Sequence, residues 1–247
     1  MSIIKNIAVF KNWYKVYLER FGLIHHEFEL IHRNGIRLIL RPNTDDLMIV
    51  KSNFVTKHYF RDFVPILRES IVVDVGAHIG CFSIMAAKNA HRVLAFEPEP
   101  NNCHMLRKNI ELNHLTNISV FNMAVMGSSG YQDMVIYDDG STGTHSLYHK
   151  RDTGIRVKQI QTISLETIIE KEGLPKIDFL KLDCEGAEYD IFRTMNLETA
   201  SKIMSIAMET HGVEKKFYID IPAKLQGLGF EVRIEHHGGY IYARRKS

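Results

Sequence analysis

The apolar positions near the start of the chain recur at helical spacing. Over residues 3–21 they are separated by lysines and one arginine, and they comprise Ile3, Ile7, Phe10, Tyr14, Tyr17, Leu18 and Phe21. We expect one helix over this range, with its apolar face packed on the main body. A contact between two copies in a homodimer and a basic helix on a membrane surface are the alternative roles.

The next apolar runs predict a hairpin. Two short runs surround Asn34-Gly35 within residues 27–41, and a tight turn of this kind needs positive φ at both residues. Residues 42–70 begin as a polar connection and lead into a predicted helix whose apolar side chains are Tyr59, Phe60, Phe63, Ile66 and Leu67.

From residue 71 onward, short apolar runs alternate with helical stretches. The apolar runs predict strands at 71–76, 92–97, 118–123, 177–183, 202–209, 230–236 and 240–245. Helices fit between them at 81–90, 100–113, 186–195 and 213–228. This alternation predicts a doubly wound α/β domain, with a mostly parallel sheet covered on both faces. An insertion over 124–176 adds expected strands at 131–137 and near 157–162.

The last two predicted strands differ from the others in their connection. Phe230, Val232 and Ile234 alternate with charged residues, and Gly238-Gly239 then leads directly into the final strand. A linker of two residues joins only antiparallel strands, so the sheet is expected to end in a hairpin with an antiparallel C-terminal strand.

The composition is that of an ordinary globular protein. The formal charge is only +2, which gives no electrostatic footprint for nucleic acid, so no nucleic-acid partner is expected. The three cysteines form no CxxC pair and no zinc-ligand pattern, which favours a reducing compartment. Lysines interrupt every apolar run near the N-terminus, and no apolar stretch is long enough for a membrane span. We therefore expect a cytoplasmic protein without a transmembrane segment.

A glycine-containing loop after the strand at 71–76 indicates a nucleoside-binding site. The strand runs into Gly76-Ala77-His78-Ile79-Gly80 and then into a helix, where glycine lets the backbone approach a ligand and the helix N-terminus offers free N–H groups. Glu97 ends the following strand about 20 residues later, where an acid accepts hydrogen bonds from ribose hydroxyls. A solvated carboxylate at a strand end is the alternative for Glu97.

The loop favours a cofactor without phosphate. A dinucleotide-binding loop has G-x-G-x-x-G, in which the middle glycine makes room for a pyrophosphate. His78 stands at that position here, and S-adenosylmethionine has no phosphate to accommodate. An NAD-dependent oxidoreductase and a non-catalytic nucleotide-binding or assembly protein are the competing hypotheses.

Four segments together resemble the FkbM-type methyltransferases. They are Val-Val-Asp-Val-Gly-Ala-His-Ile-Gly, Ala-Phe-Glu-Pro-Glu-Pro, Asn-Met-Ala-Val and Ile-Asp-Phe-Leu-Lys-Leu-Asp-Cys-Glu-Gly-Ala-Glu. The resemblance implies an S-adenosylmethionine-dependent enzyme with a Rossmann-like, seven-stranded sheet that ends in an antiparallel strand. It covers about residues 45–245. Residues 45–247 are therefore expected to form the methyltransferase domain, and 1–44 an added helix and hairpin.

The same resemblance implies roles for individual residues. The expected cofactor-binding residues are Tyr59, Asp74, Gly76, Ala77, Gly80, Glu97, Pro98, Asn122, Met123 and Ala124. In these roles the loop surrounds the methionine part, Glu97 holds the ribose, and Pro98 and residues 122–124 contact the adenine. Tyr59 corresponds to an aromatic residue that covers the cofactor. For Tyr59 and Met123 a place in the hydrophobic core is an equal alternative.

Acidic residues at the end of the strand at 177–183 are candidates for catalysis. Asp183, Glu185 and Glu188 lie at the sheet edge where open α/β folds bind ligands. Glu188 is also explained by favourable charge at a helix N-terminus. His211 follows the next strand at the same edge and has a pKa suited to a general base. No metal ligand is assigned, because HExxH is absent and Asp183, Glu185 and His211 lack a diagnostic ligand spacing, although thirteen histidines leave a metal site open.

The expected reaction is transfer of a methyl group to a hydroxyl of a small molecule or sugar. The sulfonium activates the methyl group, so the protein has to align the acceptor and remove its proton. The O-methyl assignment follows from the family resemblance, and an amine acceptor would use the same site. The loop at 140–144, rich in glycine, serine and threonine, is a candidate lid on the acceptor side.

Overall fold

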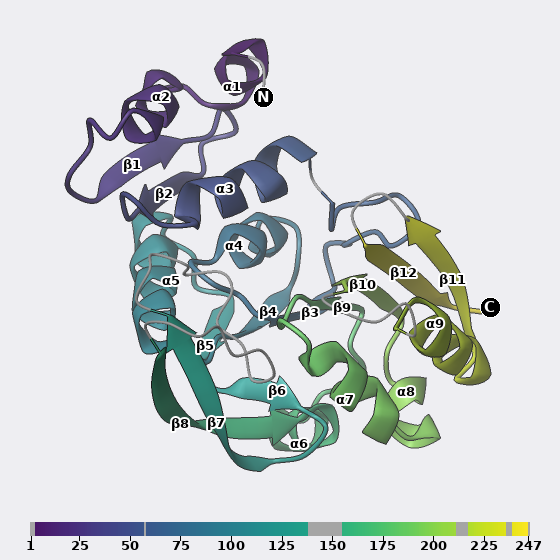
Figure 1. The fold of residues 1–247 in the computed structure, drawn as a ribbon. Helices are drawn as coiled ribbons and strands as arrows, with labels where there is room; N and C mark the ends of the chain where they lie inside the picture. The colour runs from purple at the N-terminus through teal and green to yellow at the C-terminus, as the bar shows by residue number, and fades with distance from the viewer. Residues whose placement is uncertain (1–2, 57, 138–154, 211–216, 236–238, 247) are drawn as a thin grey trace.

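A seven-stranded sheet in the order β11-β12-β10-β9-β3-β4-β5 forms the centre of the molecule (Figure 1). The computed structural model describes residues 3–56, 58–137, 155–210, 217–235 and 239–246. The strands are β3 Ile71–Val75, β4 Arg92–Phe96, β5 Ile118–Phe121, β9 Phe179–Leu182, β10 Ser205–Glu209, β11 Phe230–Glu235 and β12 Tyr240–Arg245. β12 runs against the direction of the other six strands, so its pairings with β10 and β11 are antiparallel and the remaining pairings are parallel. The expected α/β fold with an antiparallel C-terminal strand is confirmed.

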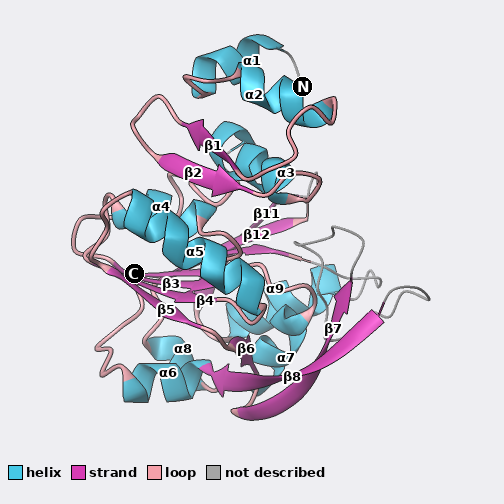
Figure 2. Cartoon of the chain, turned by 90° about the vertical axis from the view of Figure 1, so that its left-hand side faces the viewer, coloured by secondary structure: helices cyan, strands magenta, loops and turns pink. Residues whose placement is uncertain are grey.

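Helices cover both faces of this sheet (Figure 2). One face carries α4 Cys81–Ala87 and α5 Pro100–Leu112. The other carries α6 Leu165–Lys171, α7 Ala187–Thr194, α8 Leu197–Ser201 and α9 Phe217–Gly227. Successive strand residues point to opposite faces, so Val72 packs with Phe82 of α4 while Val73 packs with Ile168 of α6. The apolar runs of the strands are therefore explained by burial on both sides.

The insertion between β5 and β9 forms a separate three-stranded sheet. It contains β6 Ala124–Met126, β7 Gly130–Tyr137 and β8 Ile155–Ser164 in the order β6-β8-β7. Both strands expected in the insertion are present, whereas β6 and the short helix α6 of the insertion were not expected, nor was α8, which follows α7. Ser164 caps α6 by accepting a hydrogen bond from the Thr167 N–H, a local signal that was available in the sequence. The candidate lid at 140–144 lies outside the described residues.

The single helix expected over residues 3–21 is wrong. The structure has two helices, α1 Ile3–Val9 and α2 Tyr14–Arg20. The chain breaks between them because Phe10 forms a β-bridge with His32 and is only 1% exposed. Tertiary pairing at Phe10 thus overrides a helical period that continues through it. Among the described residues, no helix has the length and apolar character needed to cross a bilayer.

The N-terminal hairpin is confirmed, but its turn differs from the expected one. β1 Phe28–Ile31 pairs antiparallel with β2 Arg37–Leu40. Gly35 has φ +95°, whereas Asn34 is not among the residues with positive φ. The Asn34 side chain instead accepts a hydrogen bond from the Ile36 N–H at 3.2 Å. The longer turn between Ile31 and Arg37 therefore needs only one left-handed residue.

The helix expected around residues 59–67 is also wrong. Residues 58–70 contain turns and no helix, and the helical segment lies earlier, in α3 Asp46–Lys51 and the π-helical η1 Ser52–Thr56. Pro65 disfavours the helical conformation of Val64, which explains why the apolar spacing there does not form a helix. Tyr59 and Phe63 instead pack into the core as single anchors of an irregular segment.

Helix α5 connects the N-terminal hairpin to the main body. The Asn109 side chain accepts from the Ile39 N–H at 2.7 Å and donates to the carbonyls of Ile39 and Ile79. Asn113 makes the same two-way contact with the backbone of Arg37. Two asparagines thus satisfy the free edge of β2, and they fix the N-terminal elements beside the loop that follows β3.

Candidate functional site

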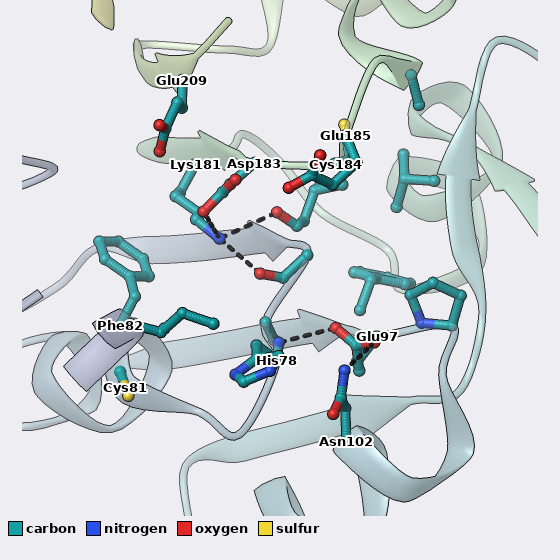
Figure 3. A pocket seen from close by; sticks show the side chains of 18 of the residues that line it. His78, Cys81, Phe82, Glu97, Asn102, Lys181, Asp183, Cys184, Glu185 and Glu209 are labelled. Atoms are coloured by element: carbon teal, nitrogen blue, oxygen red, sulfur yellow. Dashed lines mark hydrogen bonds and ion pairs between the residues drawn. The ribbon is translucent and has the colours of Figure 1, made fainter. Parts of the chain in front are cut away.

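A cavity of about 310 Å³ lies at the carboxyl ends of the parallel strands (Figure 3). Its walls come from the ends of β3, β4, β9 and β10, from the segment 48–59 and from the insertion strands β6 and β7. The lining includes Tyr59, Gly76, Ala77, Glu97, Pro98, Ala124, Asp183 and Glu185 from the expected site. Ligands of open α/β folds bind at this edge.

Glycine at the β3 loop is explained by packing of the protein on itself. Gly76 has φ +75°, and a Cβ there would lie 1.8 Å from the carbonyl oxygen of Asp183. A Cβ on Gly80, which has φ +93°, would lie 2.4 Å from a Leu106 side-chain carbon. The sequence interpretation attributed these glycines to the approach of a ligand. The structure adds a packing reason, because Gly76 lets β3 and β9 meet and Gly80 lets α5 pack on the loop, while the approach of a ligand stays a prediction.

Gly76→Ala should lower the free energy of unfolding by about 2–4 kcal/mol, through a strained positive φ and an overpacked contact. Urea unfolding followed by circular dichroism measures this difference. Gly173→Ala is the matched control, because Gly173 has φ +59° but nothing within 4 Å of its Cβ position. Equal losses in the two variants would show that the Asp183 carbonyl is not the cause.

Glu97 is a buried carboxylate held in the cavity wall. It accepts hydrogen bonds from the N–H groups of His78 at 2.8 Å and Glu99 at 3.0 Å, and from the Asn102 amide at 3.4 Å. Burial raises the pKa of Glu97 to about 7, although these three donors act in the opposite direction. Glu97 is therefore fixed in orientation and titrates near neutrality.

Lys181 is a buried cation of the described site that was not expected from the sequence. Its Nζ lies 3.5 Å from Asp183 Oδ2 (Figure 3) and 3.1 Å from Asp74 Oδ1. It also donates to the carbonyls of Val75 and Gly76 at 3.2 and 2.6 Å. The available signal was a lysine inside the apolar run of β9. Lys181 joins the end of β3 to the end of β9.

The protonation state of Lys181 follows from its two carboxylates. Burial lowers the pKa of Lys181, but Asp74 and Asp183 outweigh burial and hold it above the ordinary value. Asp74 is fully buried and also accepts a hydrogen bond from Ser83 at 2.5 Å. Because Asp74 does not line the cavity, its visible role is to hold Lys181 and the loop.

Tyr59 links two carboxylates on the other side of the cavity. Its hydroxyl lies 2.8 Å from Asp183 Oδ2 and 3.1 Å from Glu209 Oε2, so its one proton is shared between them. The Tyr240 hydroxyl donates to the same Glu209 oxygen at 3.0 Å. Burial, followed by the charge of Asp183, raises the pKa of Tyr59 well above its ordinary value. Glu209 and Tyr240 were not expected in the site.

The three acids after β9 have different environments. Glu188 is buried and accepts hydrogen bonds from the N–H groups of Cys184 at 2.8 Å and Gly186 at 2.9 Å. Its interpretation as a helix-terminus charge is confirmed. Asp183 and Glu185 instead line the cavity.

His78 occupies the cavity wall where a dinucleotide-binding loop has glycine. It has φ +50°, and its Nε2 lies 3.7 Å from the buried Asp46 carboxylate. Burial lowers the pKa of His78 to about 4, so the imidazole is neutral at pH 7. The ring therefore contributes bulk and polarity to the wall but no charge.

Several expected residues lie elsewhere. Asn122 donates to the carbonyls of Glu97 and Pro98, and Met123 packs against the core, and neither lines the cavity. His211 falls outside the described residues, so its role stays a prediction. Within the described part of the chain, no group of three or more His, Cys, Asp or Glu side chains is placed to hold a metal ion.

Comparison with known proteins agrees with this geometry. The model of the methyltransferase FkbM domain family matches residues 74–232. The 31-O-demethyl-FK506 methyltransferase FkbM of Streptomyces tacrolimicus is 26% identical over 211 residues, which cover 74% of this chain and 80% of that protein. The hexuronic acid methyltransferase AglP of Haloferax volcanii is 27% identical over 149 residues, or 60% of this chain and 59% of AglP.

A solved structure shows the same fold. The methyltransferase FkbM of Methylobacillus flagellatus superimposes with a TM-score of 0.50 at 16% identity. The match covers 80% of this chain and 53% of that one. This chain thus spans about half of that protein.

Proposed function

This chain belongs to the FkbM methyltransferase family, and from that premise we propose that it transfers the methyl group of S-adenosylmethionine to a hydroxyl of a small molecule or sugar. The observation that carries the proposal is the Glu97 carboxylate at the end of β4, facing the same cavity as the β3 loop. An acid at this position accepts hydrogen bonds from ribose hydroxyls. Family membership argues against the NAD-dependent oxidoreductase.

The residues present fit this cofactor. Glu97 would hold the ribose, Pro98 and Ala124 would lie along the adenine, and Gly76 and Ala77 would border the amino-acid part. Asp183, Glu185 and Glu209 give the cavity a negative potential, which suits a sulfonium cation. When bound, the cofactor supplies a methyl group that is already activated for transfer.

The acceptor hydroxyl must lose its proton as the new bond to the methyl group forms. We assign this role to one of the two carboxylates that line the cavity, Asp183 and Glu185, or to His211, which follows β10 in the sequence. Tyr59 and Lys181 hold the Asp183 carboxylate in place, so its orientation is fixed before the acceptor arrives. Met48, Ile49, Ser52 and Asn53 also line the cavity, beside the space that the acceptor would enter.

The names of two relatives support an oxygen acceptor. One is a 31-O-demethyl-FK506 methyltransferase and the other a hexuronic acid methyltransferase. Both act on molecules that carry hydroxyl groups, and we infer the same acceptor chemistry for this chain.

Glu97→Ala should weaken S-adenosylmethionine binding by about 10- to 100-fold, because hydrogen bonds to a charged group contribute roughly 1.5–3 kcal/mol. Isothermal titration calorimetry measures the dissociation constant. Glu235→Ala, at the end of β11 and away from the cavity, is the control. A folded Glu97→Ala variant with wild-type affinity would remove Glu97 from the cofactor site.

Cofactor affinity should also depend on pH. The pKa of Glu97 is raised to about 7, so lowering the pH through 7 protonates the carboxylate that would bind the ribose hydroxyls. Cofactor binding should then weaken by up to about tenfold per pH unit. The stability of the protein without ligand should change with pH in the opposite direction. The protonated form stabilises the fold below pH about 4.5, and this contribution is lost as the pH rises through about 7. Calorimetry at several pH values should show the dependence in wild type and a flat profile in Glu97→Ala.

A further inference from the structure

The segment 46–56 separates the cavity from a second hollow of about 510 Å³, which we call the basic groove. The groove is lined by Glu19, Arg20, Thr44, Leu47, Met48, Lys51, Ser52, Thr56 and His58. In both views α3 lies between the N-terminal helices and the helices on the sheet (Figures 1 and 2). The groove thus borders the methyl-transfer cavity but lies on the side of the N-terminal extension.

Helical spacing explains how one segment serves both hollows. Residues four apart share a side of a helix, so the segment presents three adjacent rows. In order across the segment they are Leu47 with Lys51, Met48 with Ser52, and Ile49 with Asn53. The first row lines only the groove, the second lines both hollows, and the third lines only the cavity. The middle row is therefore the rim over which a single ligand would extend.

The cavity side of this wall offers a hydrogen-bond acceptor. Asn53 is 7% exposed, and its amide nitrogen donates to the Ile49 carbonyl at 3.0 Å. Its Oδ1 is buried without a hydrogen-bond partner among the described residues. An unsatisfied buried amide oxygen is costly, so a hydroxyl of a ligand in the cavity would relieve that cost.

The groove side brings two cations together. Neither Arg20 nor Lys51 forms an ion pair or a side-chain hydrogen bond with another described residue. Burial lowers the pKa of Lys51, Glu19 opposes this effect, and the nearby charge of Arg20 reinforces it. Two cations held close against their repulsion, with one acid beside them, leave the groove positive.

We propose that the acceptor extends over the Met48–Ser52 rim and carries an oxyanion, phosphate or carboxylate, that binds Arg20 and Lys51. Its reacting hydroxyl then lies in the cavity near Asn53 and Glu209. This inference rests on the proposed methyltransferase function of the cavity. Asp183, Glu185 and Glu209 repel an anion from the cavity, while the groove attracts it, so charge fixes the orientation of the acceptor.

The residues of the groove precede the region that matches the family model. That region begins at residue 74, whereas the groove is built from residues 19–58. The recognition that we propose therefore comes from this chain's own N-terminal part, and the family match does not supply it.

Three sugars that differ only at one carbon test the proposal. Glucose 6-phosphate, glucuronate and glucose are titrated into protein saturated with S-adenosylhomocysteine, and dissociation constants are measured from NMR chemical-shift changes. We expect at least one anionic sugar to bind about tenfold more tightly than glucose, with a preference that shrinks at high salt. Whichever anion binds more tightly identifies the group as phosphate or carboxylate.

Variants that reverse the charge of a groove residue test whether the groove causes the preference for anionic sugars. The preference is the dissociation constant of glucose divided by that of the tighter-binding anionic sugar. Arg20→Glu and Lys51→Glu should each reduce this ratio by about three- to tenfold. Arg20 is exposed, so its variant remains informative if Lys51→Glu fails to fold. Lys11→Glu is the matched control, because it makes the same charge change on an exposed residue outside both hollows and should keep the preference.

Two results would overturn the proposal. One is a preference for anionic sugars that is missing in wild type or unchanged in both groove variants. The other is inorganic phosphate binding as tightly as glucose 6-phosphate, which would make the groove a separate anion site. Wild-type protein that binds no S-adenosylhomocysteine would instead contradict the proposed function of the cavity.

Discussion

Lys181→Met should lower the free energy of unfolding by about 3–5 kcal/mol, the usual cost of removing one partner from a buried ion pair. Asp74 is fully buried and Lys181 is 3% exposed, so the variant leaves a carboxylate without its cation in the core. The carbonyls of Val75 and Gly76 also lose a donor. Chemical denaturation measures the difference.

Two comparisons isolate the cause of this loss. Lys176→Met removes an exposed lysine that pairs with Asp178 at 2.6 Å, and it should cost no more than about 1 kcal/mol. Adding Asp74→Asn to Lys181→Met removes the unpaired charge and should restore part of the stability. A Lys181→Met variant as stable as Lys176→Met would show that the buried pair contributes little.

His211→Ala should reduce turnover by about two to four decades, the usual share of general acid–base catalysis, and leave cofactor affinity unchanged. In the sequence His211 follows Glu209, the last residue of β10, by two positions. The assay follows transfer of a labelled methyl group to an acceptor selected from hydroxylated sugars and metabolites. His26→Ala, an exposed histidine of the N-terminal extension, is the control.

The pH profile separates this role from a structural one. A general base must be neutral, so the wild-type rate should rise with pH through the imidazole titration. The His211→Ala rate should lack that rise. A variant that keeps both the rate and the rise would transfer the role to Asp183 or Glu185, which line the described cavity.

The amino-acid sequence alone determined the central sheet and the place of the site. Strands buried on both faces require continuous apolar runs, and such runs are visible locally. Polar residues that directly follow these runs, such as Glu97 and Asp183, must then lie at one edge, because parallel strands share their direction. The antiparallel C-terminal strand followed in the same way from a short connection.

Tertiary structure decided which side chains meet at that edge, and why. Tyr59 contacts Asp183 and Glu209, which are 124 and 150 residues away in the sequence. The local pattern of apolar residues does not predict such a contact. The role of Lys181 could not be predicted, because its buried partner Asp74 lies on β3 and comes close only when β3 and β9 pair. The sequence singled out Gly76 but could not show its packing reason, since the Asp183 carbonyl that forbids a Cβ follows another strand, β9.

The same limit explains the errors in the N-terminal part. The helical period over residues 3–21 was real, yet pairing of Phe10 with His32 divided the helix. Around residues 59–67 the aromatic spacing mimicked a helix, while each ring was in fact an anchor in the core. The spacing of apolar residues along the sequence predicts which side chains are buried. The backbone conformation that buries them depends on partners distant in sequence, and only the folded chain specifies those partners.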